Sequence, residues 1–142
     1  MLHGSLLAGM AFANAGVTAV HAFAYPIGAE FHIPHGVANS IMLIPVMRFN
    51  LVGNTQKFAK VASIFGENTQ GLSQREAAEK TISALETLTS DLNIPRRLSQ
   101  YNVKEEHVNG LAENVMKVTR LLANNPRELS LQDAVNIYKN TL

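Results

Sequence analysis

The sequence predicts an all-α fold. Apolar residues recur at three- and four-residue spacing along nearly the whole chain, and no segment alternates apolar and polar residues as a half-buried strand does. Capping residues, prolines and glycines stand where such helices would begin and end. With 142 residues the chain is long enough to bury one core, so we expect a single helical domain over residues 1–142.

The opening half is unusually apolar. Residues 2–24 are expected to form one helix, rich in Ala and Gly and apolar all round, which predicts a buried central helix. Pro26 and Gly28 are expected to end it, because proline cannot continue the hydrogen-bond ladder, and residues 25–35 to form a loop. A second apolar helix is expected over residues 36–50.

The later helices are amphipathic. One is expected around residues 58–65, and Ser73 with Glu76 forms a capping box that opens the next. A further helix is expected over residues 104–123, and Ser130 caps a last short one. Four apolar residues should face inward from the helix after Ser73: Ala77, Ile82, Leu85 and Leu88.

Composition excludes several function classes. Twelve basic and eleven acidic residues give a net charge of +1 without a basic stripe, so nucleic acid is not an expected partner. Cysteine is absent, which excludes thiolate metal sites, disulfides and a cysteine nucleophile. The composition suits a cytoplasmic protein, which is the location we expect.

The uncharged opening segment admits a second interpretation, a signal peptide or a membrane span, because the first charged side chain is Glu30. A signal requires an early positive charge, yet no Lys or Arg precedes Arg48. A span would have to accommodate Asn14 and His21 without basic anchors. A buried helix explains the segment better, so no membrane partner is expected.

Two histidines, His21 and His35, flank the expected loop. Neutral imidazole is the commonest protein ligand for iron, zinc and copper, and a turning loop would let the two converge. A structural interpretation fits the spacing equally well: His21 would bond a carbonyl at a helix end, and His35 would mark the start of the next helix. His3 and His107 are expected on the surface or on a helix face, and His32 in solvent.

The amino-acid sequence around these histidines resembles the signature of the iron-containing alcohol dehydrogenases. The resemblance rests on His-Ala-Phe-Ala-Tyr-Pro-Ile-Gly at 21–28, on the run Pro-His-Gly-Val-Ala-Asn-Ser-Ile-Met-Leu-Ile-Pro-Val-Met-Arg-Phe-Asn at 34–50, and on residues 7–16 and 121–126. It covers nearly the whole chain. It implies the C-terminal helical half of such an enzyme, a dehydroquinate synthase-like helical bundle.

The resemblance also implies a metal site that this sequence only half supplies. Family members bind NAD(P) in an N-terminal Rossmann-like domain and hold a divalent metal with one Asp and three His, of which the last two match His21 and His35. The first two form an Asp-x-x-x-His pair, yet no Asp precedes Asp91, and neither Asp91 nor Asp133 is followed four residues later by His. No strand, glycine-rich turn and helix for a dinucleotide appears either, so we expect the N-terminal dinucleotide-binding domain to be absent.

By resemblance, the parent enzyme transfers a hydride between a small alcohol or aldehyde and NAD(P). Its metal is iron, with zinc and manganese as alternatives. Phe12 and Tyr25 match positions at the substrate cleft, although a core role for Phe12 and a bond from Tyr25 to the backbone remain open. Many relatives have histidine where Tyr25 stands. No catalytic residue is assigned.

Two hypotheses follow. In the first, the chain is the metal-binding domain of an alcohol dehydrogenase, truncated or paired with an N-terminal domain on a separate chain, inactive alone, and a homo-oligomer or a partner of that domain. In the second, it is a non-enzymatic folded remnant or a self-associating helical interaction domain, held together by an apolar face that the cofactor domain would otherwise cover.

Overall fold

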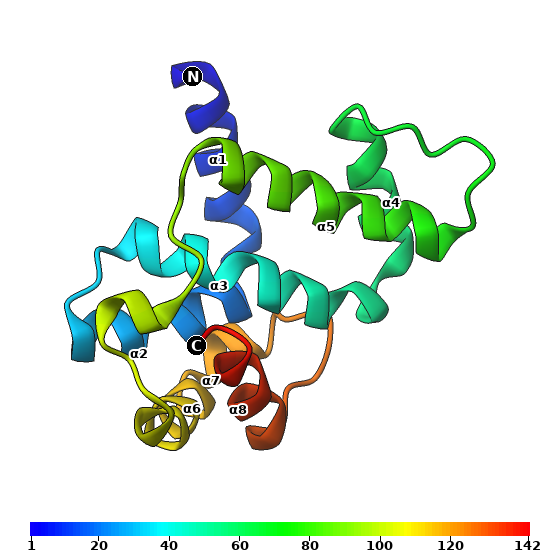
Figure 1. Ribbon diagram of the computed structural model, residues 1–142. Helices are drawn as coiled ribbons and strands as arrows, with labels where there is room; N and C mark the ends of the chain where they lie inside the picture. Colours follow the sequence, from blue (N-terminus) through cyan, green and yellow to red (C-terminus); the bar gives the residue numbers. More distant parts are fainter.

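The chain folds into helices throughout. A computed structural model describes all 142 residues and contains no strand, which confirms the predicted class (Figure 1). The α-helices are α1 (Leu2–Ala15), α2 (Ala19–Phe31), α3 (His35–Asn50), α4 (Thr55–Ile64), α5 (Gln74–Asp91), α6 (Val108–Met116), α7 (Thr119–Leu122) and α8 (Leu131–Lys139). Three short 3₁₀ helices join them: η1 (Leu51–Gly53), η2 (Leu98–Tyr101) and η3 (Glu105–His107).

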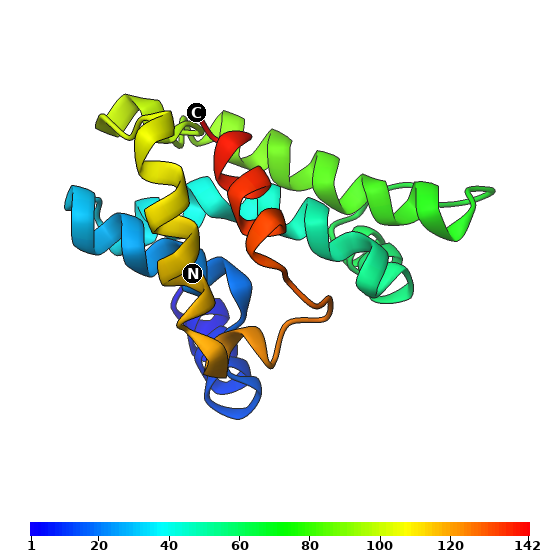
Figure 2. The same cartoon turned by 90° about the horizontal axis from the view of Figure 1, so that it is seen from below.

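The paired helices α2 and α3 lie at the centre. On one side α5 packs on α3, and α4 packs on α5 (Figure 1). On the other side α6 and α7 pack on α2, with α8 beside α6 (Figure 2). The main core lies among these elements, with a smaller cluster between η1, α4 and α5. The fully buried large side chains of the main core include Phe23, Ile27, Met42, Leu98, Leu111 and Tyr138.

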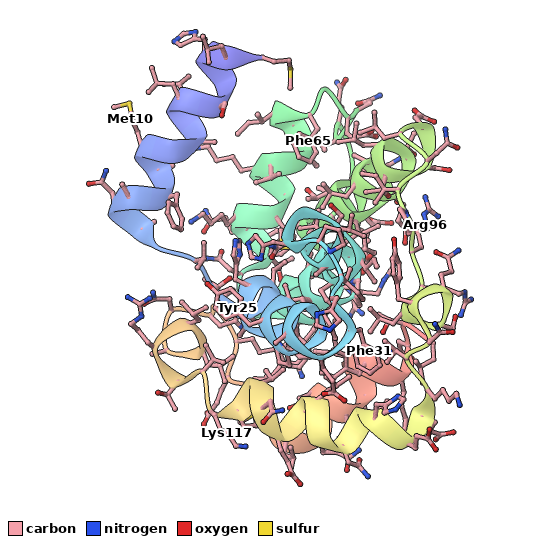
Figure 3. The ribbon with its side chains drawn as sticks, turned by 90° about the vertical axis from the view of Figure 1, so that its left-hand side faces the viewer. Met10, Tyr25, Phe31, Phe65, Arg96 and Lys117 are labelled. Atoms are coloured by element: carbon pink, nitrogen blue, oxygen red, sulfur yellow. The ribbon has the colours of Figure 1, made fainter.

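The first predicted helix is wrong in two respects. Residues 2–24 do not form one helix, because α1 ends at Ala15, α2 begins at Ala19, and the two meet at 100°. Gly16 makes the break, since its φ of 71° and ψ of −167° lie in a region that essentially only glycine occupies. The predicted burial also fails: α1 has no buried residue and leads away from the body (Figure 3).

The predicted loop over residues 25–35 is mostly helix. α2 continues through Pro26, and the chain turns only at His32, whose φ is 54°. A proline removes one helix hydrogen bond and crowds the carbonyl four residues earlier. Burial of Pro26 offsets this cost, and the buried Tyr138 hydroxyl donates to the carbonyl oxygen of Phe23 at 2.8 Å, in the turn that the proline disturbs.

Four predicted helices are confirmed with small shifts of their ends: α3, α4, α5 and α8. α5 begins with the predicted capping box, in which the Glu76 N–H donates to the hydroxyl of Ser73 and the Ser73 N–H donates to the carboxylate of Glu76. The cap at Ser130 has the same form, with Asp133 as its acidic partner.

Two details of the later helices are wrong. Leu88 does not face inward but is exposed, because it lies off the face that α5 turns toward α4. The single helix predicted over residues 104–123 is divided into η3, α6 and α7. The break after α6 falls at Lys117 and Val118, and Val118 is a β-branched residue, which favours a helix less than an unbranched one.

α3 and η1 together, residues 35–53, are long and apolar enough to cross a membrane by length and composition. In the fold this segment packs against α2, α5 and α8. Its side chains Ala38, Ile41, Met42 and Val46 are buried in the protein core. Burial within the protein thus covers 33% of the apolar segment.

Candidate functional site

The two histidines that flank the predicted loop come together. His21 lies in the first turn of α2, and His35 begins α3. The packing of the two helices brings the two imidazole rings next to each other. Their ring centroids are 5.3 Å apart, with the planes at 56°. Because an imidazole nitrogen binds a metal at about 2.1 Å, rings at this separation are able to share one ion.

Tyr25 completes an aromatic cluster with the pair. It follows His21 by one helical turn, and its ring meets that of His21 edge-on, with the centroids 6.3 Å apart. The same ring stacks on His35 at 5.9 Å, with the planes at 25°. The side chain lies at the surface, on the side of the molecule shown in Figure 3. The ring of Tyr25 thus contacts both imidazoles.

The chemistry of this cluster favours neutral imidazole. Partial burial lowers the pKa of His21, and the neighbouring His35 lowers it further because two positive charges would repel each other. No hydrogen bond contributes to that shift, so the alternative in which the His21 ring bonds a carbonyl receives no support. The neutral form is the one that binds a metal.

Asn39 is a site residue that the sequence analysis missed. Its side-chain Nδ2 donates to Nε2 of His35 at 2.9 Å and to the backbone oxygen of His35 at 3.0 Å. In this arrangement Nε2 accepts, and the ring proton lies on Nδ1. The Asn39 Oδ1 is buried and has no hydrogen-bond partner. The available signal was the four-residue spacing between Asn39 and His35, which places both on one face of a helix.

Phe12 and Tyr25 line one hollow of about 300 Å³. Phe12 is 56 % exposed, so its alternative role in the core is excluded. The structure therefore joins the two positions that were predicted to border the substrate, and Tyr25 links their hollow to the histidines. A second hollow of about 380 Å³ lies against His21, Asn39 and Ser40.

The other three histidines lie outside the cluster. His3 and His32 are exposed, as expected. His107 is half-buried, and its ring packs edge-on against Phe31, with the centroids 5.0 Å apart. Its Nδ1 accepts a hydrogen bond from the N–H of Lys104.

Comparison with known proteins identifies this arrangement. A family model described as "Fe-containing alcohol dehydrogenase family, C-terminal" matches residues 1–142. The chain belongs to the iron-containing alcohol dehydrogenase family. Among curated members of the family, 1,3-propanediol dehydrogenase of Klebsiella pneumoniae is 43% identical over 98% of the chain. NAD-dependent methanol dehydrogenase of Bacillus methanolicus is 37% identical over 100% of it.

A solved structure of 1,3-propanediol oxidoreductase matches the fold with a TM-score of 0.93, at 43% identity over 97% of the chain. The chain spans 36% of that protein, 36% of the Klebsiella enzyme and 37% of the Bacillus enzyme. Its helical fold is that of the C-terminal part of an iron-containing alcohol dehydrogenase.

The family implies a metal, and the residues of this iron-containing alcohol dehydrogenase domain fit part of a site. Two imidazoles converge, and the orphaned oxygen of Asn39 lies beside them. Imidazole suits iron, zinc and other first-row divalent metals. No group of three or more His, Cys, Asp or Glu side chains in the chain is arranged to hold a metal. The two imidazoles that converge belong to His21 and His35.

Proposed function

We propose that this chain is the metal- and substrate-side domain of an iron-containing alcohol dehydrogenase, an oxidoreductase that transfers hydride between a small alcohol or aldehyde and NAD(P). One observation supports the proposal above all: His21 and His35, fourteen positions apart, meet with their rings 5.3 Å from each other. The names of the relatives agree, since they act on propanediol and methanol, one of them with NAD.

In this proposal His21 and His35 hold a divalent metal: iron, with zinc or manganese as alternatives. When bound, the metal supplies Lewis-acid stabilisation to the substrate oxygen. Phe12 and Tyr25 form apolar walls that orient the carbon chain and exclude water. In the structure Nε2 of His35 accepts a hydrogen bond from Asn39, so a metal bound at Nε2 would replace that hydrogen bond.

Cofactor binding is assigned to residues outside this sequence. The chain has no strand, so it lacks the strand, glycine-rich turn and helix that cradle a dinucleotide. We propose that NAD(P) is bound by an N-terminal domain with which this domain pairs, and that the assembly is cytoplasmic and homo-oligomeric.

The test is a calorimetric titration of zinc or ferrous iron into the apo chain. Two ligands should bind weakly, and His21→Ala or His35→Ala should each lower the affinity by at least about tenfold. His107→Ala is the matched control, because His107 packs on Phe31 away from the pair, and it should leave the affinity unchanged. Equal loss in all three variants, or unchanged binding in the first two, would refute the metal site.

A second function, a non-enzymatic remnant or a self-associating helical domain, is favoured by α1. This helix has no buried residue, and five of its large apolar side chains are exposed: Leu2, Leu6, Leu7, Met10 and Phe12. Clustered apolar surface of this kind commonly binds another protein surface. A monomer in sedimentation at high concentration would argue against self-association, and metal binding by the histidines would favour the enzyme.

A further inference from the structure

The hollow lined by Phe12 and Tyr25 contains one charged side chain, Arg120. Apart from these three residues, its lining consists of Ala13, Gly16, Val17, Leu121 and Asn124, so no carboxylate faces it. Three different segments meet there: α1 with the Gly16 break, the exposed side of α2, and α7. Arg120 is exposed and is the one charged side chain on the wall of this hollow.

Arg120 is available to bind a ligand. The ion pairs of the chain use other basic residues, namely Arg48, Lys104, His107 and Lys139. Two further donors line the same hollow, the side-chain amide of Asn124 and the hydroxyl of Tyr25. The amide of Asn124 also lies close to Gly16, where an added Cβ would come within 3.3 Å of its Nδ2. The polar groups of this hollow are therefore mainly hydrogen-bond donors.

The hollow adjoins the two histidines at which the substrate oxygen is proposed to lie. Tyr25 lines it and also stacks on His35, with the ring of His21 at 6.3 Å. A short substrate whose oxygen lies at the two imidazoles would extend past Tyr25 into this hollow. Its far end would then meet Arg120, whose planar guanidinium matches a carboxylate or sulfonate through two parallel hydrogen bonds.

We propose that Arg120 recognises an anionic group at the far end of the substrate, so that the site selects alcohols and aldehydes that carry a carboxylate or sulfonate. This inference rests on the proposed function, because it takes the substrate oxygen to lie at His21 and His35. Arg120 acts on specificity and has no part in the hydride transfer itself.

The experiment compares two three-carbon probes, 3-hydroxypropanoate and 1,3-propanediol, which differ mainly in the charged end. Each is titrated into the zinc-loaded chain and followed by NMR chemical-shift changes. The variants are Arg120→Gln, Arg120→Lys and the control Lys117→Gln. Lys117→Gln is the control because it removes one positive charge, as Arg120→Gln does. Lys117 (Figure 3) does not line the hollow, and its Nζ donates a hydrogen bond to the side-chain oxygen of Asn114.

The wild-type chain and Lys117→Gln should bind 3-hydroxypropanoate about fivefold more tightly than 1,3-propanediol, a modest preference because the guanidinium is partly solvated. Arg120→Gln should remove that preference without changing the affinity for the diol, and Arg120→Lys should keep part of it. A preference that survives in Arg120→Gln overturns the inference, as would direct binding of the carboxylate to zinc. Absence of saturable shifts with 3-hydroxypropanoate overturns it as well.

The His21→Ala variant separates this inference from the proposed function. If Arg120 sets the preference but neither probe responds to zinc or to His21→Ala, the anion site stands and the metal site fails. If both probes depend on zinc and His21 but ignore Arg120, the proposed function stands and the anion site fails.

Discussion

At the scale of single residues, Gly53 shows how closely distant segments approach. A Cβ added to it would lie 2.7 Å from the carbonyl oxygen of Pro126 and 3.0 Å from the Cβ of Arg127. The same loop is tied to the end of α3 by two hydrogen bonds between the side-chain amides of Asn50 and Asn125, at 2.8 and 2.7 Å. Backbone that is held in this way cannot move aside for an added methyl group.

Gly53→Ala should therefore lower the free energy of unfolding by about 1–3 kcal/mol, because the added carbon meets backbone. Gly110→Ala is the control. It lies on α6 with nothing within 4 Å of its added Cβ, so it should be neutral or raise the free energy of unfolding by up to about 1 kcal/mol. Urea unfolding of both variants measures the difference. Equal effects would contradict the close approach at Gly53.

The same scale shows how far the sequence defines the candidate site. His21, His35, Tyr25 and Phe12 were found because their surrounding residues resemble a known signature. Arg120 was assigned to no site, because it lies about a hundred positions from Phe12 and no periodic pattern reports which distant segments meet. Contacts of this kind follow from packing of the whole chain and not from local spacing.

At the scale of helices, two capping boxes fix the starts of α5 and α8 and carry a pH dependence. Hydrogen bonds from Ser73 lower the pKa of Glu76, and those from Ser130 lower the pKa of Asp133. A carboxyl group with a lowered pKa in the folded state stabilises the fold above its unfolded pKa. That contribution is lost as the pH falls through the unfolded pKa, near 4, toward the folded one.

The free energy of unfolding should accordingly fall between about pH 5 and pH 3. In Glu76→Gln and Asp133→Asn this fall should be smaller, because the substituted side chains do not titrate. Chemical denaturation at a series of pH values tests this. Glu113→Gln, an exposed change on α6 outside any cap, serves as the control, and an equal reduction there would show that general charge and not the caps sets the slope.

Helix ends were predictable where local chemistry decides them, as in both capping boxes. They were not predictable where tertiary packing overrides local preference. Pro26 lies inside α2 and is buried, and Tyr138, far along the chain, donates a hydrogen bond to the carbonyl of Phe23 in the same turn. Gly16 ends helix α1, whereas Gly4 and Gly9 lie within that helix. The chain turns at Gly16 and then enters α2, which packs in the core.

At the scale of the whole molecule, we expect no alcohol-dependent reduction of NAD or NADP by the 142-residue chain alone. It brings two imidazoles together but has no three-residue metal cluster, and it has no strand with which to form a dinucleotide-binding turn. Orienting cofactor and substrate supplies several kcal/mol of an enzyme's advantage, on the order of 7–11 kcal/mol in favourable cases. Absorbance at 340 nm with metal, alcohol and either cofactor measures the rate. Turnover that His21→Ala abolishes would show the expectation to be wrong.

The bond from Tyr138 to Phe23 also joins parts of the chain that are synthesised at different times. It joins positions 115 residues apart, so α2 and α3 leave the ribosome long before α8 exists to cover them. At about 5–20 residues per second, the apolar side of α2 waits on the order of ten seconds for its last partner. During that interval Phe23 lacks the ring of Tyr138, against which it packs in the folded protein. Helix α8, which is synthesised last, then packs with Tyr138 against Phe23 of α2.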